Sequence, residues 1–272
     1  MSSSHIRGLM SGQLKIVLLG ATGQTGQPLL RKCLERGHLV VAVIRTAASL
    51  AVEHENLRIE VADIFSSESL TPIFRGQDLV ISALGFPKQL DEKMKKFTES
   101  MAAMLEAMRE ARLGRIITMS AWYTNPLTRT GQLMFDTMWS KVPGLVNTLD
   151  NEGEMDLMLA RTEETISFTS VLVPSLCWDP PTTRQILVSP GKTWVEGAAG
   201  LMSREGNFQF FPFIFISSFF ADVARFLLSV AESDRSGRWN RVAVAVTTEY
   251  SPEEEAQGFH RLRAQMEKHL NQ

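Results

Sequence analysis

The residues with the clearest chemical meaning form a glycine-rich run near the start of the chain, Gly20-Ala21-Thr22-Gly23-Gln24-Thr25-Gly26. An apolar stretch precedes the run, and an amphipathic stretch to Gly37 follows it. In a turn between a strand and a helix, Gly20 allows a tight bend, Gly23 a close approach to a pyrophosphate, and Gly26 close packing of the helix. The amide groups at the helix N-terminus would then face the anionic oxygens. The run therefore predicts dinucleotide binding, and not merely a tight turn, through Gly20, Thr22, Gly23, Gln24, Thr25 and Gly26.

Strands and helices alternate along the chain that must position this turn. Continuous apolar runs are typical of strands buried on both faces of a parallel sheet. These runs are residues 14–19, 39–44, 57–61, 79–82, 115–119 and 167–173. The segments between the later runs predict helices over 66–75, 91–112 and 149–164. Right-handed crossovers of this kind build an α/β fold with a doubly wound parallel sheet, the Rossmann fold, whose ligand lies at the carboxyl ends of the strands.

The alternation stops after Pro174. Residues 174–217 hold several prolines, two tryptophans and short apolar runs, which predict a small irregular lobe over the edge of the sheet. In α/β enzymes, substrate pockets form in such segments. We therefore expect a substrate lobe built from about residues 121–147 and 174–217.

The remaining C-terminal segments return to regular structure. The sequence predicts a helix over 219–231, a strand over 241–246 and a tail helix that begins with a capping sequence at Ser251. We therefore expect a single Rossmann domain over residues 13–272, preceded by a disordered lead over residues 1–12.

The composition argues against several classes of partner. The formal net charge is -2 and the basic residues are scattered, so the chain lacks the positive field that nucleic acid binding requires. Cys33 and Cys177 are too few for a disulfide framework, and the cysteines and the five histidines lack metal-ligand spacing. No apolar run reaches the roughly 18 residues of a membrane span. We expect a cytoplasmic monomer or homodimer with no metal site, no nucleic-acid partner and no membrane span.

Several motifs, in their order and spacing, resemble a known family. They are GATGQTG at 20–26, Val43-Ile44-Arg45, Val61-Ala62-Asp63-Ile64, Ala83-Leu84-Gly85 and RIITMSA at 115–121. Together they resemble the atypical short-chain dehydrogenase/reductases, NAD(P)H-binding proteins of the biliverdin-IXβ/flavin reductase type. The resemblance covers residues 14–174, fades over the lobe and returns at 216–231. The chain also looks similar to accessory oxidoreductases of fungal aromatic polyketide pathways.

The end of the second predicted strand indicates which cofactor is preferred. A site that prefers NADH places a carboxylate there to accept a hydrogen bond from the ribose 2′-hydroxyl. This sequence has Arg45 and Thr46 instead, and a cation beside a hydroxyl suits the 2′-phosphate of NADPH. The alternative is a solvated arginine at a strand end. We expect NADPH as the cofactor.

The resemblance implies further cofactor contacts. Asp63 would accept a hydrogen bond from the adenine amine, and Ile64 would donate its backbone amide. Asp63 could instead be the N-cap of the next helix. The ribose and pyrophosphate side of the cofactor would be lined by Ala83, Leu84 and Gly85. Pro174 is a further expected cofactor-binding residue.

The catalytic residues are harder to assign. Ordinary short-chain dehydrogenases use Tyr-x-x-x-Lys, but Tyr123 is followed four places later by Leu127. The resemblance implies that Ser120 is the active-site serine beside the nicotinamide, with Tyr123 as the available phenol. Tyr123 could instead be a loop tyrosine in contact with water, and Lys141 is a distant candidate for a charge partner.

Aromatic residues are concentrated in the segments expected around the nicotinamide. Planar, conjugated substrates fit aromatic walls. The predicted walls are Trp122, Trp139, Trp178 and Trp194. Core filling is the alternative, and it is the one we favour for Phe211, Phe213 and Phe215, whose alternation puts them on one face of a strand. A membrane-surface patch is a third option.

These observations predict an NADPH-dependent reductase that transfers hydride to a conjugated ketone, a quinone or another planar aromatic substrate. Two other classes of function stay open. A sensor protein would bind NADP(H) with the same fold and without turnover, which the missing Tyr-x-x-x-Lys pair permits. A non-redox enzyme, such as a cyclase or an epoxide-opening catalyst, would keep the fold and lack the hydride step.

Overall fold

The computed structural model describes residues 12–46, 50–86, 95–129, 135–136, 139–177, 185–193, 195, 217–233 and 237–248. Several predicted features lie outside these residues. They are nearly all of the N-terminal lead, Trp178, Trp194, the phenylalanines at 211, 213 and 215, and the tail helix from Ser251.

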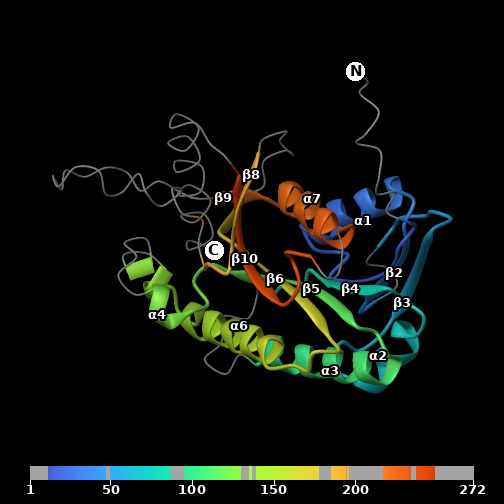
Figure 1. Ribbon diagram of the computed structural model, residues 1–272, viewed down its shortest axis with the longest axis horizontal. Coiled ribbons are helices and arrows are strands. Elements are labelled where there is room, and N and C mark those ends of the chain that lie inside the picture. Colours follow the sequence, from blue (N-terminus) through green and yellow to red (C-terminus); the bar gives the residue numbers. More distant parts are fainter. Residues whose placement is uncertain are drawn as a thin grey trace.

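The central feature is an eight-stranded sheet with the strand order β3-β2-β1-β4-β5-β6-β10-β8 (Figure 1). All neighbouring strands pair in parallel except β8, which is antiparallel to β10. The strands are β1 (Lys15–Leu19), β2 (Leu39–Ile44), β3 (Leu57–Val61), β4 (Leu79–Ser82), β5 (Arg115–Ala121), β6 (Ser167–Val173), β8 (Ile186–Pro190) and β10 (Val242–Thr248). The predicted doubly wound parallel sheet is confirmed, with its change of winding direction between β1 and β4.

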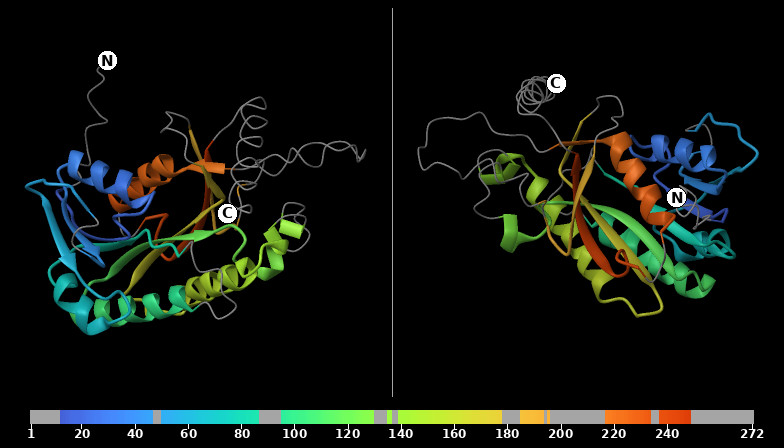
Figure 2. Two further views of the ribbon diagram at one scale, coloured as in Figure 1. Left: turned by 180° about the vertical axis from the view of Figure 1, so that it is seen from behind. Right: turned by 45° about the horizontal axis from the view of Figure 1, so that its top comes forward.

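Helices cover both faces of the sheet (Figures 1 and 2). One face carries α1 (Gly26–Glu35) and α7 (Phe220–Ala231), and the other carries α2 (Ser67–Phe74), α3 (Lys96–Ala111) and α6 (Leu145–Ala160). The smaller elements are α4 (Pro126–Arg129), η2 (Trp139–Lys141), and the two paired strands β7 (Ser175–Cys177) and β9 (Ser217–Phe219). None of the helices in the described part of the chain is long and apolar enough to cross a membrane.

The hydrophobic core forms two layers because alternate residues of a strand point to opposite faces of the sheet. Ile16 and Leu18 of β1 pack in the cluster that includes residues of α1 and α7. Val17 and Leu19 pack in the cluster that includes residues of α2, α3 and α6. Burial on both faces explains why the strands read as continuous apolar runs in the sequence.

The segment predicted to be an irregular lobe contains a regular strand of the main sheet. β8 pairs with β10 through partners such as Val188 and Val246, and Gly191, with a φ of +71°, turns the chain just after it. The run of β-branched and aliphatic residues in β8, followed by a Pro-Gly turn, is typical of a strand. Its antiparallel partner, β10, lies more than 50 residues later, so the local sequence does not show the pairing.

Hydrogen bonds from the partly buried Arg241 fix the end of α6 against the sheet. The Arg241 guanidinium donates hydrogen bonds of 2.9 to 3.4 Å to carbonyl oxygens at and just beyond that end, those of Ala160, Thr162, Glu163 and Ile166. A cation is favourable where the helix dipole is negative and the last carbonyls lack helical partners. Arg241 therefore helps to set the position of α6, which carries Glu152 and Asp156.

We expect Arg241→Met to lower the free energy of unfolding by about 2 to 3 kcal/mol, because it removes charge-assisted hydrogen bonds to several carbonyls. Urea denaturation measures the change. The matched control is Arg161→Met at the exposed C-cap of the same helix, for which a change within about 0.5 kcal/mol is expected. Equal denaturation midpoints for the two variants would contradict this role of Arg241.

Candidate functional site

The glycine-rich turn lies where the strand order reverses. Gly20 follows β1 with a φ of +81°, and a Cβ atom there would lie 2.5 Å from the carbonyl oxygen of Ala83, which follows β4. The two loops are therefore in backbone contact at the carboxyl ends of neighbouring strands. In doubly wound sheets this is where the ligand crevice lies.

The turn leads directly into α1, and it leaves no room for a side chain at Gly26. The Gly23 amide donates to the Gly20 carbonyl at 2.9 Å, and a Cβ atom on Gly26 would lie 1.9 Å from the same oxygen. Glycine at position 26 is thus required for the helix to begin so close to the strand. This is the packing role that the spacing predicts.

The first turn of α1 offers unpaired amide groups. Its N-cap, Thr25, is 5% exposed and makes no side-chain capping bond. Within the described part of the chain, no protein acceptor bonds the amides of Gln24, Thr25 and Gly26. The side chains of Thr22 and Gln24 are exposed, and Gln27 Nε2 donates to the Thr22 carbonyl at 3.0 Å. Open amides at a helix N-terminus fit the pyrophosphate of a dinucleotide.

The ends of β2 and β3 lie side by side. Ile44 pairs with Val61, so Arg45 and Asp63 follow at the same edge, and both side chains are exposed. Asp63 is not the N-cap of α2, because Ser66 Oγ accepts the hydrogen bond from the Ser69 amide at 3.2 Å. Asp63 instead accepts a hydrogen bond from the Phe65 amide at 3.0 Å. The helix-cap alternative for Asp63 is therefore wrong.

The other predicted cofactor residues lie at the same edge of the sheet. Ala83 and Leu84 are partly buried and Gly85 is exposed just after β4. Ile64 is buried after β3, and Pro174 is buried after β6. The structure thus brings the predicted cofactor residues to the carboxyl ends of the strands, and their contacts with the cofactor stay a prediction.

Ser120 is part of a buried hydrogen-bond cluster that the sequence analysis missed. Ser120 is the penultimate residue of β5, is 1% exposed, and donates to Asp156 Oδ2 of α6 at 2.6 Å. Ser170 of β6 donates to Asp156 Oδ1 at 2.6 Å, and Thr124 donates to Oδ2 at 3.4 Å. Asp156 therefore joins α6 to β5, β6 and the turn after β5.

A second carboxyl group lies one helical turn from Asp156. Glu152 is partly buried, and it precedes Asp156 by four residues, so the two side chains lie on the same face of α6. Burial raises the pKa of Glu152 to about 8, with a further contribution from the charge of Asp156. Burial also raises the pKa of Asp156 to about 6, against the opposing effect of the three hydroxyl groups. Of the two carboxyl groups, Glu152 therefore keeps its proton to the higher pH.

The local sequence explains how α6 comes so close to the strand ends. A Cβ atom on Gly153 would lie 2.5 Å from the Thr124 carbonyl oxygen, so this position requires glycine. Asn151 accepts a hydrogen bond from the Phe97 amide at 3.1 Å and donates to Thr98 Oγ1 at 2.9 Å, which ties α6 to the start of α3. These contacts therefore hold α6 in the position that lets Asp156 bond Ser120 at the end of β5.

A signal for this cluster is present in the sequence. Glu152 and Asp156 have the same four-residue spacing as the Tyr-x-x-x-Lys pair that the chain lacks. A glycine inside a helix costs about 1 kcal/mol relative to alanine, so Gly153 indicates close packing. The sequence predicts this helix from residue 149, whereas α6 begins at Leu145. The hydrogen-bond partners of Asp156 come from segments that lie far from it in the sequence.

The two aromatic residues after β5 are buried. Tyr123 is 7% exposed and packs against Phe135, with a distance of 5.9 Å between ring centroids. Burial raises the pKa of Tyr123 to about 12. Trp122 is 1% exposed and donates through Nε1 to the Leu172 carbonyl at 3.0 Å. Both residues thus fill the core, and substrate contacts by either one stay a prediction. Trp139 lies in η2.

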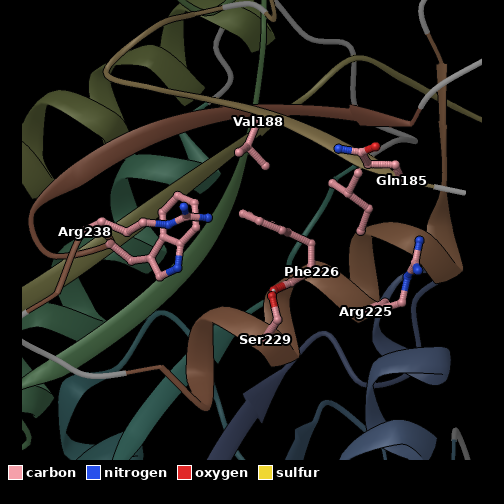
Figure 3. A pocket seen from close by; sticks show the side chains of 8 residues that line it. Gln185, Val188, Arg225, Phe226, Ser229 and Arg238 are labelled. Carbon is pink, nitrogen blue, oxygen red and sulfur yellow. The ribbon is translucent and has the colours of Figure 1, made fainter. Parts of the chain in front are cut away.

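A separate pocket of about 710 Å³ lies between α7 and β8, on the face of the sheet opposite α6 (Figure 3). Phe226 packs edge-on against Trp239 there, with ring centroids 5.4 Å apart, and the Arg238 guanidinium lies 4.0 Å from the Trp239 ring centroid. This pocket does not reach the Ser120 cluster. Among the residues described, no group of three His, Cys, Asp or Glu residues could hold a metal ion.

The raised pKa of Glu152 predicts a pH-dependent stability. Its usual pKa is 4.5, and the folded protein raises it to about 8, so the folded state keeps a proton that the unfolded state loses in this range. The contribution of this carboxyl to stability is therefore fully present below pH 4.5 and is lost as the pH rises through about 8. Glu152→Gln cannot ionise and escapes this loss.

Between about pH 5 and pH 9, we expect wild type to lose about 1 to 3 kcal/mol more of its free energy of unfolding than Glu152→Gln does. Urea denaturation at a series of pH values measures the difference. The control is Glu154→Gln on the exposed side of α6, which should follow wild type. Parallel curves for all three proteins would show that Glu152 is ionised like a surface glutamate.

Known proteins share both the sequence pattern and the fold. The chain is 26% identical to YwnB of Bacillus subtilis (strain 168) over 181 residues, which are 66% of this chain and 80% of YwnB. A wide-type short-chain dehydrogenase/reductase from Veillonella parvula DSM 2008, solved in complex with NADP, has a TM-score of 0.63 and 16% identity over 87% of this chain and 94% of its own. The anaerobillin reductase ChuY from Escherichia coli O157:H7 has a TM-score of 0.59 and 14% identity over 87% of this chain and 98% of its own. At these identities, the two structures establish a common fold.

The family follows from the sequence match. Residues 20–205, more than half of the chain, match the NAD(P)H-binding family. The match begins at the first glycine of the turn after β1 and extends past the Ser120 cluster and β8. It confirms the family that the sequence motifs indicate. The chain belongs to the NAD(P)H-binding family.

Proposed function

We propose that the protein is an NADPH-dependent reductase that transfers hydride to a conjugated ketone, a quinone or another planar aromatic substrate. One observation carries this proposal. The glycine turn after β1 and the Ser120–Asp156–Glu152 cluster at the end of β5 lie at the same edge of the sheet, with only β4 between them. A dinucleotide in the turn and a group that holds a proton would therefore flank one crevice.

The residues present fit such a cofactor. The amides of the first turn of α1 would hold the pyrophosphate, Arg45 the 2′-phosphate, and Asp63 with Ile64 the adenine. The loop after β4 would line the ribose and pyrophosphate side, and Pro174 would also contact the cofactor. When bound, the cofactor supplies hydride, and the protein supplies orientation and proton transfer. The similar fold of an enzyme solved with NADP and of a protein named as a reductase supports this assignment.

The proposed substrate class rests on the aromatic residues of segments 121–147 and 174–217. Tryptophans provide flat apolar walls, which bind conjugated rings well. The two buried aromatic residues after β5 give this part of the site a rigid, apolar base. The aromatic residues and this apolar base fit a planar substrate that accepts hydride and has one carbonyl oxygen near Glu152 and Asp156.

A second candidate is a non-redox enzyme of the cyclase or epoxide-opening class. The observation that favours it is the same carboxyl pair, because a protonated Glu152 beside an ionised Asp156 could serve acid catalysis without hydride transfer. The two candidates differ in stoichiometry. A reductase consumes one NADPH for each product, and a non-redox enzyme consumes none.

The experiment that tests the function follows NADPH absorbance with a panel of quinones, flavins and polyketide ketones, with products identified by mass spectrometry. We expect NADPH loss that matches the appearance of a product two hydrogens heavier than the substrate. Conversion without NADPH loss would establish the non-redox class. Binding of NADPH with no conversion of any compound would favour a sensor.

We expect tighter binding of NADPH than of NADH, by about 1 to 3 kcal/mol, because Arg45 would contact the 2′-phosphate. Arg45→Ala should lose most of this preference while its NADH affinity stays nearly unchanged. Fluorescence titration measures both affinities. Arg58→Ala, at an exposed arginine within β3, is the control and should keep the preference. Equal affinities of wild type for the two cofactors would contradict the assignment.

A further inference from the structure

Reduction of a carbonyl needs a proton as well as a hydride, and Ser120 is poorly placed to give one. A serine hydroxyl has a single proton. That of Ser120 is donated to Asp156 at 2.6 Å, and the residue is 1% exposed. While this hydrogen bond exists, Ser120 has no proton left for a substrate oxygen. Its role is to hold Asp156.

Tyr123 is also poorly suited to proton donation. Its side chain lies in an apolar cluster with Trp122, Phe135 and Leu149. Burial raises the pKa of Tyr123 to about 12, so the phenol is a weaker acid than a free tyrosine. A general acid works best when its pKa is near the working pH.

Unlike Ser120 and Tyr123, Glu152 is suited to donate a proton to a substrate oxygen. The helix α6 leads from the β5 loop back to the start of β6, so Glu152 lies one turn closer than Asp156 to the carboxyl edge of the sheet. Glu152 is partly buried, so part of the residue stays exposed to solvent. The hydroxyl groups of Ser120 and Ser170 donate to Asp156, which favours its ionised form. A second negative charge one helical turn away is then unfavourable, so the proton stays on Glu152.

We propose that Glu152 is the proton donor of this site, and that Asp156, held by Ser120 and Ser170, keeps Glu152 in its acid form. This inference rests on the proposed reductase function. When bound, the reduced cofactor would supply hydride to the carbonyl carbon of the substrate, and the π electron pair of the carbonyl would move to its oxygen. The O–H bond of Glu152 breaks and its proton goes to that oxygen. The product is an alcohol, and the Glu152 carboxylate then takes a proton from water.

The charged groups around Glu152 are consistent with this assignment. The elements packed against α6 are α3, β5 with the turn that follows it, η2, and β6, which has no titratable side chain. Their titratable side chains near this end of α6 are Lys95 and Lys96 at the start of α3, Tyr123 after β5, and Lys141 in η2. Among the described residues, the charge that acts on Glu152 is that of Asp156.

The first test measures the proton directly and needs no turnover. The full-length protein without cofactor is labelled with ¹³C at the glutamate carboxyl carbons, and its NMR spectrum is recorded across the pH range. We expect one carboxyl signal that titrates near pH 8, is absent from Glu152→Gln and is present in the control Glu154→Gln. Asp156→Asn should move this titration to lower pH, because the neighbouring charge is gone. Titration of every glutamate in the ordinary range would overturn the proposal.

The second test compares activity with cofactor binding. Glu152→Gln keeps the shape of the side chain, so its NADPH affinity should equal that of wild type. Its reduction rate should fall by about 10²- to 10⁴-fold, the usual contribution of a general acid, and the decline of the wild-type rate above about pH 8 should disappear. Glu154→Gln should keep full activity.

The outcomes separate this inference from the proposed function. Full activity of Glu152→Gln, with wild type active, would overturn the donor role and leave the reductase function intact. A wild type that binds NADPH and reduces no substrate would overturn the reductase function and, with it, the donor role, even if the Glu152 signal titrates near pH 8.

Discussion

Parallel pairing of the strands is the constraint on which the rest of this structure depends. Parallel neighbours must be joined by crossovers, which place helices on both faces and gather the carboxyl ends of all these strands at one edge. The reversal of strand order between β1 and β4 then opens a crevice where Gly20 meets Ala83. Residues far apart in the sequence, from the glycine turn to Ser120, therefore lie along one edge.

The cost of burying a charged group explains how the cluster around Asp156 is built. An isolated buried carboxylate is costly, and Asp156 is acceptable because hydroxyl groups from β5, β6 and the intervening turn donate to it. The same bonds position α6 against the sheet, with Gly153 making room for the Thr124 carbonyl. The same cluster thus supports both the packing of α6 and the proton-donor role that we propose for Glu152.

Much of the fold could be predicted from the sequence. The predicted bounds of β2, β3, β4 and β6 agree with the structure, because strands buried on both faces appear as unbroken apolar runs. β5 is two residues longer than predicted, ending at Ala121, and α6 begins four residues earlier. Such boundaries depend on tertiary partners, such as the pairing of Ser120 with Leu172.

The sequence by itself determined the nucleotide turn, because the tight bend and close helix packing are local demands that glycine alone satisfies at Gly20 and Gly26. It also determined the family, through motifs in a fixed order. Only the tertiary structure decided which group the Ser120 hydroxyl bonds. Its partner, Asp156, comes from another element, and the proton on Glu152 depends on burial and on a neighbouring charge. The four-residue spacing of Glu152 and Asp156 shows in the sequence that the two carboxyl groups are close. Their burial is a property of three-dimensional packing, so no local pattern encodes it.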